Sequence, residues 1–115
     1  MEMLEGLFHS IDSMNVDKFL SYLSEDCTFK FGNSEPAVGK EAVRMAVSGF
    51  FSMIKGLKHE LLNTWEVKNT VICNGEVTYT RKDDSKIKLP FCNVFVMEKG
   101  KIKEYLIYID INPLF

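Results

Sequence analysis

The sequence GKIKEYLIYIDINPLF, residues 100–115, decides how the rest of the chain is interpreted. Its Ile and Tyr residues are typical of a β-strand, which we expect over residues 101–111. One carboxylate, that of Asp110, stands near its end between Ile109 and Ile111. Burying a carboxylate among apolar groups is costly unless it is paired, hydrated or neutral. Asp110 is therefore either a solvated cap at the strand end or a general base that projects into a pocket.

The composition indicates a globular protein with one domain, which we assign to residues 1–115. Hydrophobic residues make up 46% of the chain and aromatic residues 12%, which is enough for a packed core. The net charge of −2 provides no basic surface for nucleic acid or an anionic membrane, so we expect neither partner. No apolar run approaches the ~18 residues of a membrane span, and the first residues lack the pattern of a signal peptide. We therefore expect a cytoplasmic protein.

Metal and disulfide chemistry has little support in the sequence. Cys27, Cys73 and Cys92 are odd in number and form no CxxC pair, so we expect free thiols buried in strands. His9 and His59 are the only imidazoles, and neither has a partner at metal-ligand spacing. We expect no metal and no cofactor.

The apolar spacing predicts three helices followed by strands. Helical spacing is found over residues 2–14, 17–24 and 40–54, and a first strand is expected over residues 27–31. Long strands separated by short turns follow over residues 57–67, 71–82, 86–97 and 101–111. This order predicts an α+β fold in which the helices cover one face of a curved antiparallel sheet.

Short turns at residues 69–70, 83–84 and 99–100 would set the strand register, and residues directly opposite each other share a face of the sheet. The predicted pairs include Asn93 with Leu106, Glu76 with Phe91, and Trp65 with Asn74. One face then combines apolar side chains with polar ones, which is typical of a small-molecule pocket. The polar members of this face are His59, Asn63, Asn74, Glu76, Asn93 and Asp110.

The opposite face is more uniformly apolar in this register, and no helix remains to cover it. An exposed apolar sheet face indicates an interface. We therefore expect a homodimer that packs through this face. The side chains expected at the interface include Val94, Val96, Tyr105 and Ile107.

The chain resembles the SnoaL-like polyketide cyclase branch of the nuclear transport factor 2 (NTF2) superfamily over nearly its whole length. The segments that carry the resemblance are SEDCTF (residues 24–29), GKEAV (residues 39–43), His59 with Trp65, and the tail from Gly100. The resemblance implies a cone-shaped α+β fold with a pocket under three N-terminal helices. Because this fold hosts isomerases, hydrolases, cyclases and non-catalytic binders, it does not fix the activity.

The superfamily's functional positions map unevenly onto this chain. Phe31 stands where ketosteroid isomerases carry their aspartate base, and Asn93 stands at their oxyanion-hole aspartate. Asn74 replaces the arginine of limonene epoxide hydrolases, although Glu76 and Asp110 match their two acids. SnoaL-type cyclases use an aspartate near the chain end to remove a proton next to a carbonyl. The resemblance implies this role for Asp110.

Three hypotheses follow. In the first, the protein is an isomerase or aldol cyclase for a small apolar substrate, without a cofactor; the candidate catalytic residues are Asp110, Glu76, Asn93 and His59. In the second, the same pocket binds a ligand without catalysis. In the third, the domain is a structural dimer module. The residues expected to contact the small apolar ligand are Trp65, Tyr22, Phe31, Phe91, Tyr108, Asn74 and Asn63.

Overall fold

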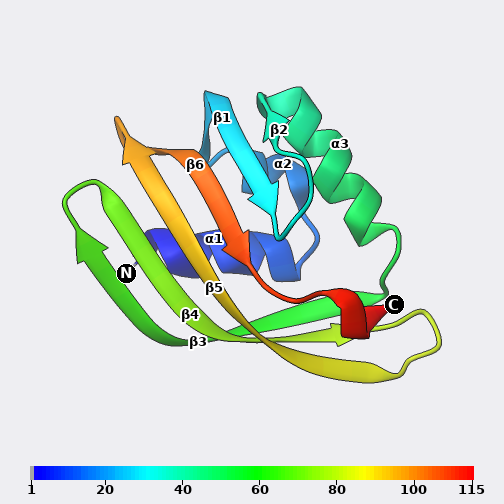
Figure 1. Cartoon of the computed structure of the whole chain (residues 1–115). Helices are drawn as coiled ribbons and strands as arrows, with labels where there is room; N and C mark the ends of the chain where they lie inside the picture. Colours follow the sequence, from blue (N-terminus) through cyan, green and yellow to red (C-terminus); the bar gives the residue numbers. More distant parts are fainter. Residues whose placement is uncertain (1) are drawn as a thin grey trace.

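The computed structural model describes residues 2–115 as a curved sheet with helices on its concave side (Figure 1). The predicted α+β class and the three helices are confirmed. The helices and strands are α1 (Glu2–Asp12), α2 (Val16–Leu20), β1 (Leu23–Phe31), β2 (Ala37–Val38), α3 (Lys40–Phe51), β3 (Gly56–Val67), β4 (Thr70–Thr80), β5 (Lys86–Glu98) and β6 (Lys101–Tyr108), followed by a short 3₁₀ helix, η1 (Asn112–Leu114).

The strand order in the sheet is β2-β1-β6-β5-β4-β3. The meander from β3 to β6 is antiparallel, as expected, but β1 pairs with β6 in parallel. Strand β1 also begins at Leu23, inside the segment predicted as the second helix, and the short strand β2 was not predicted. The sheet is therefore mixed rather than purely antiparallel, because the chain crosses from β1 through α3 to the far edge before it returns.

Helix α1 packs its apolar side against the concave face of the sheet. Leu4, Leu7, Phe8 and Ile11 recur at helical spacing and are all buried. Figure 1 shows α1 behind β4 and β5, with α3 beyond β1 and β2. Within residues 2–115, no helix has the length and apolar character needed to cross a bilayer.

The three hairpins differ in how well the sequence predicted them. The turn at Lys99 and Gly100 has the two residues expected, both with positive φ, and Glu98 pairs with Lys101 as predicted. A bulge then shifts the register between Val96 and Met97. The connection from β4 to β5 is longer than predicted, because Thr80 pairs with Lys86. Strand β3 carries a second bulge between Leu61 and Asn63.

Each of these shifts moves side chains to the opposite face, because successive residues of a strand alternate between faces. Consequently the predicted faces are correct for β5 but exchanged for β4 and β6. The concave side holds, among others, His59, Val77, Tyr79, Phe91, Asn93, Tyr105 and Ile107. The convex side holds, among others, Ile72, Asn74, Glu76, Cys92, Val94, Leu106 and Tyr108.

Two residues expected at the dimer interface are therefore in a different place. Tyr105 is buried in the core and Ile107 lines a cavity on the concave side. Val94 and Val96 lie on the convex side, as expected, and both are half-buried. The correction follows from the bulge before Met97, which exchanges the faces of β6 relative to the predicted register.

The C-terminal tail is held against the sheet by Arg81. Its guanidinium donates from Nε to the Leu114 carbonyl at 3.0 Å and from Nη2 to the Pro113 carbonyl at 3.0 Å. Leu114 is buried in the core. Arg81 therefore fixes the tail against the sheet.

Cys27 and Cys73 are buried free thiols, and Cys92 is a half-buried one. Burial raises the pKa of the Cys73 thiol to about 12. Cys73 thus stays protonated at neutral pH and is a packing residue rather than a nucleophile.

Candidate functional site

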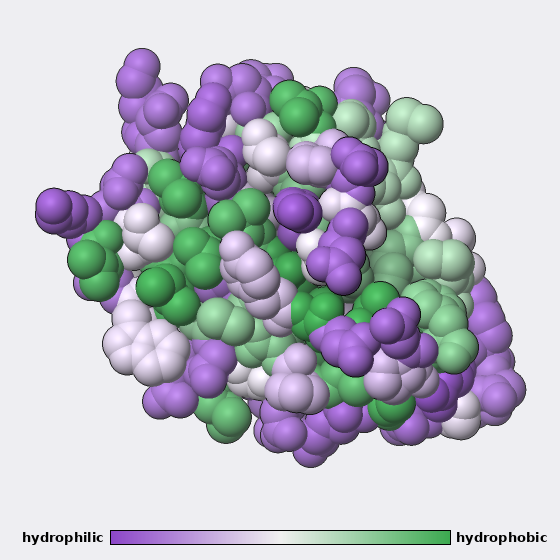
Figure 2. Space-filling model, in the orientation of Figure 1, coloured by the Kyte–Doolittle hydropathy of each residue, from purple (hydrophilic) through white to green (hydrophobic). Residues whose placement is uncertain are grey.

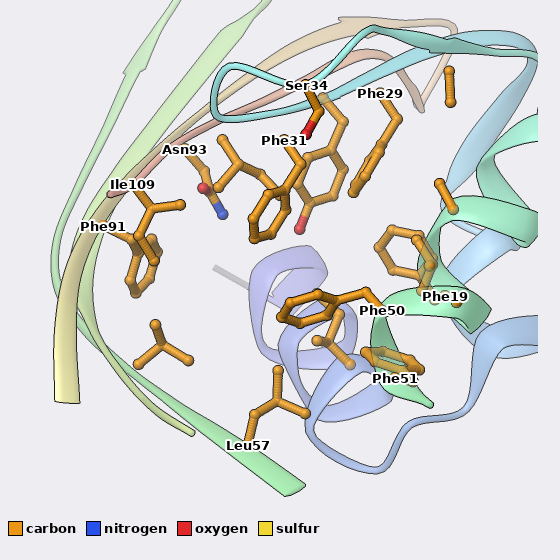
Figure 3. Close-up of a pocket in the computed structure, with 18 of the residues that line it drawn as sticks. Phe19, Phe29, Phe31, Ser34, Phe50, Phe51, Leu57, Phe91, Asn93 and Ile109 are labelled. Atoms are coloured by element: carbon orange, nitrogen blue, oxygen red, sulfur yellow. The ribbon is translucent and has the colours of Figure 1, made fainter. Parts of the chain in front are cut away.

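A cavity of about 500 Å³ lies between the concave side of the sheet and the helices. Its walls are mainly aromatic and aliphatic, and Figure 3 shows Phe31, Phe50, Phe51 and Phe91 around the enclosed space. Cavities of this size that are apolar apart from a few convergent polar groups are typical small-molecule sites. The lining residues are Ile11, Phe19, Phe29, Phe31, Ser34, Glu35, Ala37, Met45, Ala46, Val47, Gly49, Phe50, Phe51, Met53, Leu57, His59, Val77, Tyr79, Phe91, Asn93, Tyr105, Ile107 and Ile109.

One polar side chain that lines the cavity, His59, forms a pair with an aspartate. Asp12 is the last residue of α1, and its Oδ1 lies 2.7 Å from Nδ1 of His59 on β3. The other carboxylate oxygen, Oδ2, accepts the backbone N–H of His59 at 3.0 Å. A carboxylate can only accept, so it favours the imidazole tautomer with the proton on Nδ1. In that tautomer Nε2 carries the free lone pair.

Aromatic rings on either side hold the imidazole in place. The centroid of His59 lies 4.8 Å from that of Phe8 on α1 and 5.2 Å from that of Phe91 on β5. The His59 side chain is 10% exposed and lines the cavity. From residue 2 to residue 115 no group forms a hydrogen bond with Nε2. The pair can therefore act as a general base toward a molecule in the cavity.

Asn93 supplies a second polar group. It is 2% exposed, and its Oδ1 is buried without a hydrogen-bond partner among the described residues. Figure 3 shows the amide pointing into the cavity from β5. Leaving a buried polar group unpaired costs about 1–3 kcal/mol, so native proteins rarely do it without a reason. An amide in this position can both donate to and accept from a ligand.

Two tyrosines add hydroxyl groups to the cavity wall. Tyr79 and Tyr105 are almost fully buried, and burial raises the pKa of both hydroxyls well above the ordinary value. Both therefore remain neutral O–H donors at neutral pH. Neither hydroxyl forms a hydrogen bond within the part of the chain that the structure describes. These two hydroxyls and the Asn93 amide are among the hydrogen-bond donors available to a ligand oxygen, as is the hydroxyl of Ser34.

The structure brings four of the predicted site residues together and leaves the others outside. His59, Asn93, Phe31 and Phe91 all line the cavity, as expected. The remaining candidates are not among its lining residues: Tyr22, Asn63, Trp65, Asn74, Glu76, Tyr108 and Asp110. Asn74, Glu76 and Tyr108 lie on the convex side, because of the register shifts described above.

Asp110 is at the exposed end of the chain's last strand, where Ile109 rather than Asp110 lines the cavity. Its Oδ1 accepts the backbone N–H of Asn112, the first residue of η1, at 3.1 Å. This arrangement corrects the predicted projection of Asp110 into a pocket; it is the alternative of a solvated cap. Asp110 lies two residues beyond Tyr108, the last paired residue of β6, so its side chain can turn to water.

Sequence reasoning missed Asp12, Tyr79 and Tyr105 as site residues. One local signal pointed to Asp12: a carboxylate at the C-terminal end of a helix is disfavoured by the helix dipole, which suggests a compensating partner. The tyrosines carried no such signal, because their inward orientation depends on the bulge and the long turn. Within residues 2–115 there is no group of three or more metal-ligating side chains.

Comparisons with known proteins place the chain. A profile of the SnoaL-like domain matches residues 4–105. An NTF2-like protein of unknown function from Burkholderia pseudomallei superposes with a TM-score of 0.90 at 13% identity, covering 99% of this chain and 92% of that one. A protein from Jannaschia sp. described as a SnoaL-like polyketide cyclase gives a TM-score of 0.85 at 14% identity, with coverages of 98% and 86%.

TerC co-crystallised with polyporic acid is a third similar structure, with a TM-score of 0.86 at 14% identity and coverages of 98% and 92%. Identities this low establish the fold alone. No match was found among curated protein sequences. Because the SnoaL-like profile extends over most of the chain and the neighbours share its architecture, the chain belongs to the SnoaL-like domain family and has the NTF2-like fold.

Proposed function

We propose that the cavity binds an apolar carbonyl compound and that His59 removes a proton from the carbon next to the carbonyl group. One observation carries this proposal: His59 lines a mainly apolar cavity, and Asp12 occupies its Nδ1, which leaves Nε2 as the ring nitrogen without a hydrogen-bond partner among residues 2–115. The sequence had suggested Asp110 as the base. His59 takes this role here because Asp110 is exposed and does not line the cavity.

The proposed reaction begins with proton transfer from the α-carbon to Nε2 of His59. The electron pair of the C–H bond moves into the carbonyl group and forms an enolate, while the imidazole becomes an imidazolium next to the Asp12 carboxylate. The enolate oxygen accepts a hydrogen bond from the Asn93 amide or from a tyrosine hydroxyl. Return of the proton to another carbon gives an isomer, and attack of the enolate carbon on a second carbonyl gives an aldol product.

The apolar wall supports this chemistry in two ways. Phe31, Phe50 and Phe91 provide contact area for an apolar ligand. They also exclude water, which strengthens the hydrogen bonds to a developing oxyanion. The co-crystal of TerC with polyporic acid is consistent with an organic ligand in a fold of this kind.

The test is exchange of the acidic α-protons of an aromatic ketone such as 2-tetralone in D2O, followed by proton NMR. We expect exchange above background with the wild type, and exchange at the background rate with His59→Gln, since general-base groups typically contribute 10²–10⁴-fold. Asp110→Asn is the matched control and should retain the wild-type rate. Exchange that survives His59→Gln overturns the assignment of the base. Ketone binding without exchange in the wild type would indicate a non-catalytic binder.

We also propose that two copies of the chain pack through their convex sheet faces. Apolar side chains gather over β4, β5 and β6 on the face shown in Figure 2. Ile72, Val94 and Leu106 are only half-buried there, and Tyr108 is 58% exposed. On the same side, the buried Oδ1 of Asn74 has no hydrogen-bond partner within residues 2–115. An uncovered apolar surface of this kind favours association.

A further inference from the structure

The mouth of the cavity is identified by the lining residues that are solvent exposed. All other lining residues are buried or half-buried. The exposed ones come from only two places, the turn between β1 and β2 and the α3 segment with the residues just after it. The mouth therefore lies between that turn and α3. Its residues are Ser34, Glu35, Met45, Ala46, Gly49 and Met53.

Gly49 occupies the α3 side of this mouth without a packing reason. Glycine inside a helix is less stable than alanine, because it loses more conformational freedom on folding. A Cβ built on Gly49 would meet no heavy atom within 4 Å, so the fold does not require a glycine here. A larger side chain at this position would extend into the open space at the mouth.

The charges around the cavity disfavour an anionic ligand. Among the lining residues that the structure describes there is neither lysine nor arginine, and the carboxylate of Glu35 stands at the mouth. The Asp12 carboxylate contacts Nδ1 of His59 and is itself 23% exposed. A buried anion is strongly destabilised unless a cation or several hydrogen-bond donors compensate it. A sulfonate, phosphate or carboxylate in this cavity would meet neutral donors such as Asn93, Tyr79 and Tyr105, but no lysine or arginine among the described lining residues.

We propose that the cavity selects uncharged aromatic molecules and admits them through the mouth between Gly49 and Glu35. This inference rests on the proposed ligand binding in the cavity, but not on catalysis by His59. It narrows the substrate class to neutral ring compounds and excludes ligands that carry an acidic group into the cavity.

Two dyes with the same rings test the selection by charge. N-phenyl-1-naphthylamine is neutral, and its 8-sulfonate is anionic; both become fluorescent in apolar sites. We expect the neutral dye to bind at least tenfold more tightly. Glu35→Gln should tighten binding of the sulfonate about threefold at low salt, as expected for one charge several ångströms away in water, without affecting the neutral dye. Equal affinity of the two dyes for the cavity would overturn the selection by charge.

A tryptophan scan of α3 tests the mouth. Gly49→Trp should reduce the affinity for the neutral dye at least tenfold. Ser48→Trp is the control: it places an indole at an exposed position of α3 that does not line the cavity, and it should leave the affinity for the neutral dye unchanged. Fluorescence of the sulfonate dye that remains with Gly49→Trp reports binding outside the cavity. This fluorescence is subtracted from the wild-type signal before the affinities are compared. If Gly49→Trp does not affect binding of the neutral dye, the proposal that ligands enter beside Gly49 is wrong.

The outcomes separate this inference from the proposed reaction. If ketone exchange depends on His59 but is unchanged in Gly49→Trp, the proposed entrance beside Gly49 is wrong and the proposed reaction is still supported. Neutral-dye binding that depends on Gly49, without any ketone exchange, supports the inference and refutes the reaction. Ultraviolet circular dichroism of both tryptophan variants establishes that a loss of binding is not a loss of fold.

Discussion

Asp12 holds His59 through two hydrogen bonds, 2.7 Å to the ring Nδ1 and 3.0 Å to the backbone N–H, across 47 residues of sequence. This contact joins the end of α1 to the middle of β3. It fixes both the position and the tautomer of the imidazole. The packing of α1 on the sheet thereby determines the chemistry available in the cavity.

The first prediction concerns Asp12→Asn. An asparagine can donate to Nδ1 and so stabilise the tautomer in which Nε2 carries the proton and cannot act as a base. We expect the rate of ketone α-proton exchange to fall about 10²-fold, within the range attributed to a positioned base. Affinity for N-phenyl-1-naphthylamine should change less than threefold.

Asp110→Asn is the control for Asp12→Asn, since both remove one carboxylate but only Asp12 contacts His59. If the two variants lose the same amount of activity, the effect is not specific to the histidine. An unchanged exchange rate in Asp12→Asn would refute the positioning role of this carboxylate.

The second prediction concerns Gly75 on β4. A Cβ at Gly75 would lie 2.0 Å from the backbone carbonyl oxygen of Glu60, next to the bulge of β3. Since the obstacle is backbone, β3 must move to accept it. We expect Gly75→Ala to lower the free energy of unfolding by about 1–3 kcal/mol in urea denaturation, the usual range for overpacking.

Gly49→Ala is the matched glycine variant, because its Cβ would enter open space on a helix. It should raise the free energy of unfolding by about 0.4–1 kcal/mol. The opposite signs of the two variants separate the steric role of Gly75 from a general effect of glycine. A neutral Gly75→Ala would contradict the close approach of the two strands.

The third prediction concerns assembly. Val94→Glu places a charge in the convex face, where the side chain is half-buried. Because an unpaired charge at an apolar interface is costly, we expect sedimentation velocity to show a dimer for the wild type and a monomer for the variant. Ser48→Glu, an exposed position on α3, should remain dimeric. A wild type that is monomeric at micromolar concentration would rule out this interface.

The fourth prediction concerns pH. Hydrogen bonds from Lys103 and Ser24 hold the pKa of Asp26 below its ordinary value, and Lys103 joins β6 to β1. A carboxyl group whose pKa is lowered by folding stabilises the native state above the pKa of the unfolded chain. That stabilisation disappears as the pH falls through the lowered value.

We therefore expect Asp26→Asn to be less stable than the wild type above about pH 5, and the difference to vanish as the pH falls below the lowered pKa of Asp26, in thermal melts at low salt. Because the pair is exposed, the difference should shrink in molar salt. A stability gap that widens as the pH falls would contradict the sign of the shift.

The sequence predicted the elements better than their register. Helical spacing identified Leu4, Leu7 and Phe8 as the buried side of α1, and the turn at Lys99 and Gly100 was placed correctly. These features depend on neighbours in the chain, which a sequence displays directly. The longer turn before β5 and the bulges in β3 and β6 have no comparable local pattern, so Glu76 and Tyr105 were assigned to the wrong face.

His59 was placed correctly on the face of Phe91 and Asn93, although the prediction assumed a two-residue turn between β4 and β5 and a β3 without a bulge. Both assumptions were wrong. The turn between β4 and β5 exchanged the faces once, and the bulge in β3 exchanged them again. Two shifts of one residue cancel, because side chains alternate with a period of two. The agreement at His59 is therefore a property of the register and not evidence for the predicted turns.

By itself, the sequence determined the α+β class, the order of helices and long strands, and the resemblance to the SnoaL-like family, since periodicity and turn chemistry are local. Only the tertiary structure decided which carboxylate contacts a residue that lines the cavity. In the sequence, Asp110 stands between Ile109 and Ile111, whereas Asp12 stands between Ile11 and Ser13. The packing of α1 against β3 brings Asp12 to His59, and the end of pairing in β6 leaves Asp110 in water. Such contacts depend on bulges and helix packing, which are set by the whole core rather than by neighbouring residues.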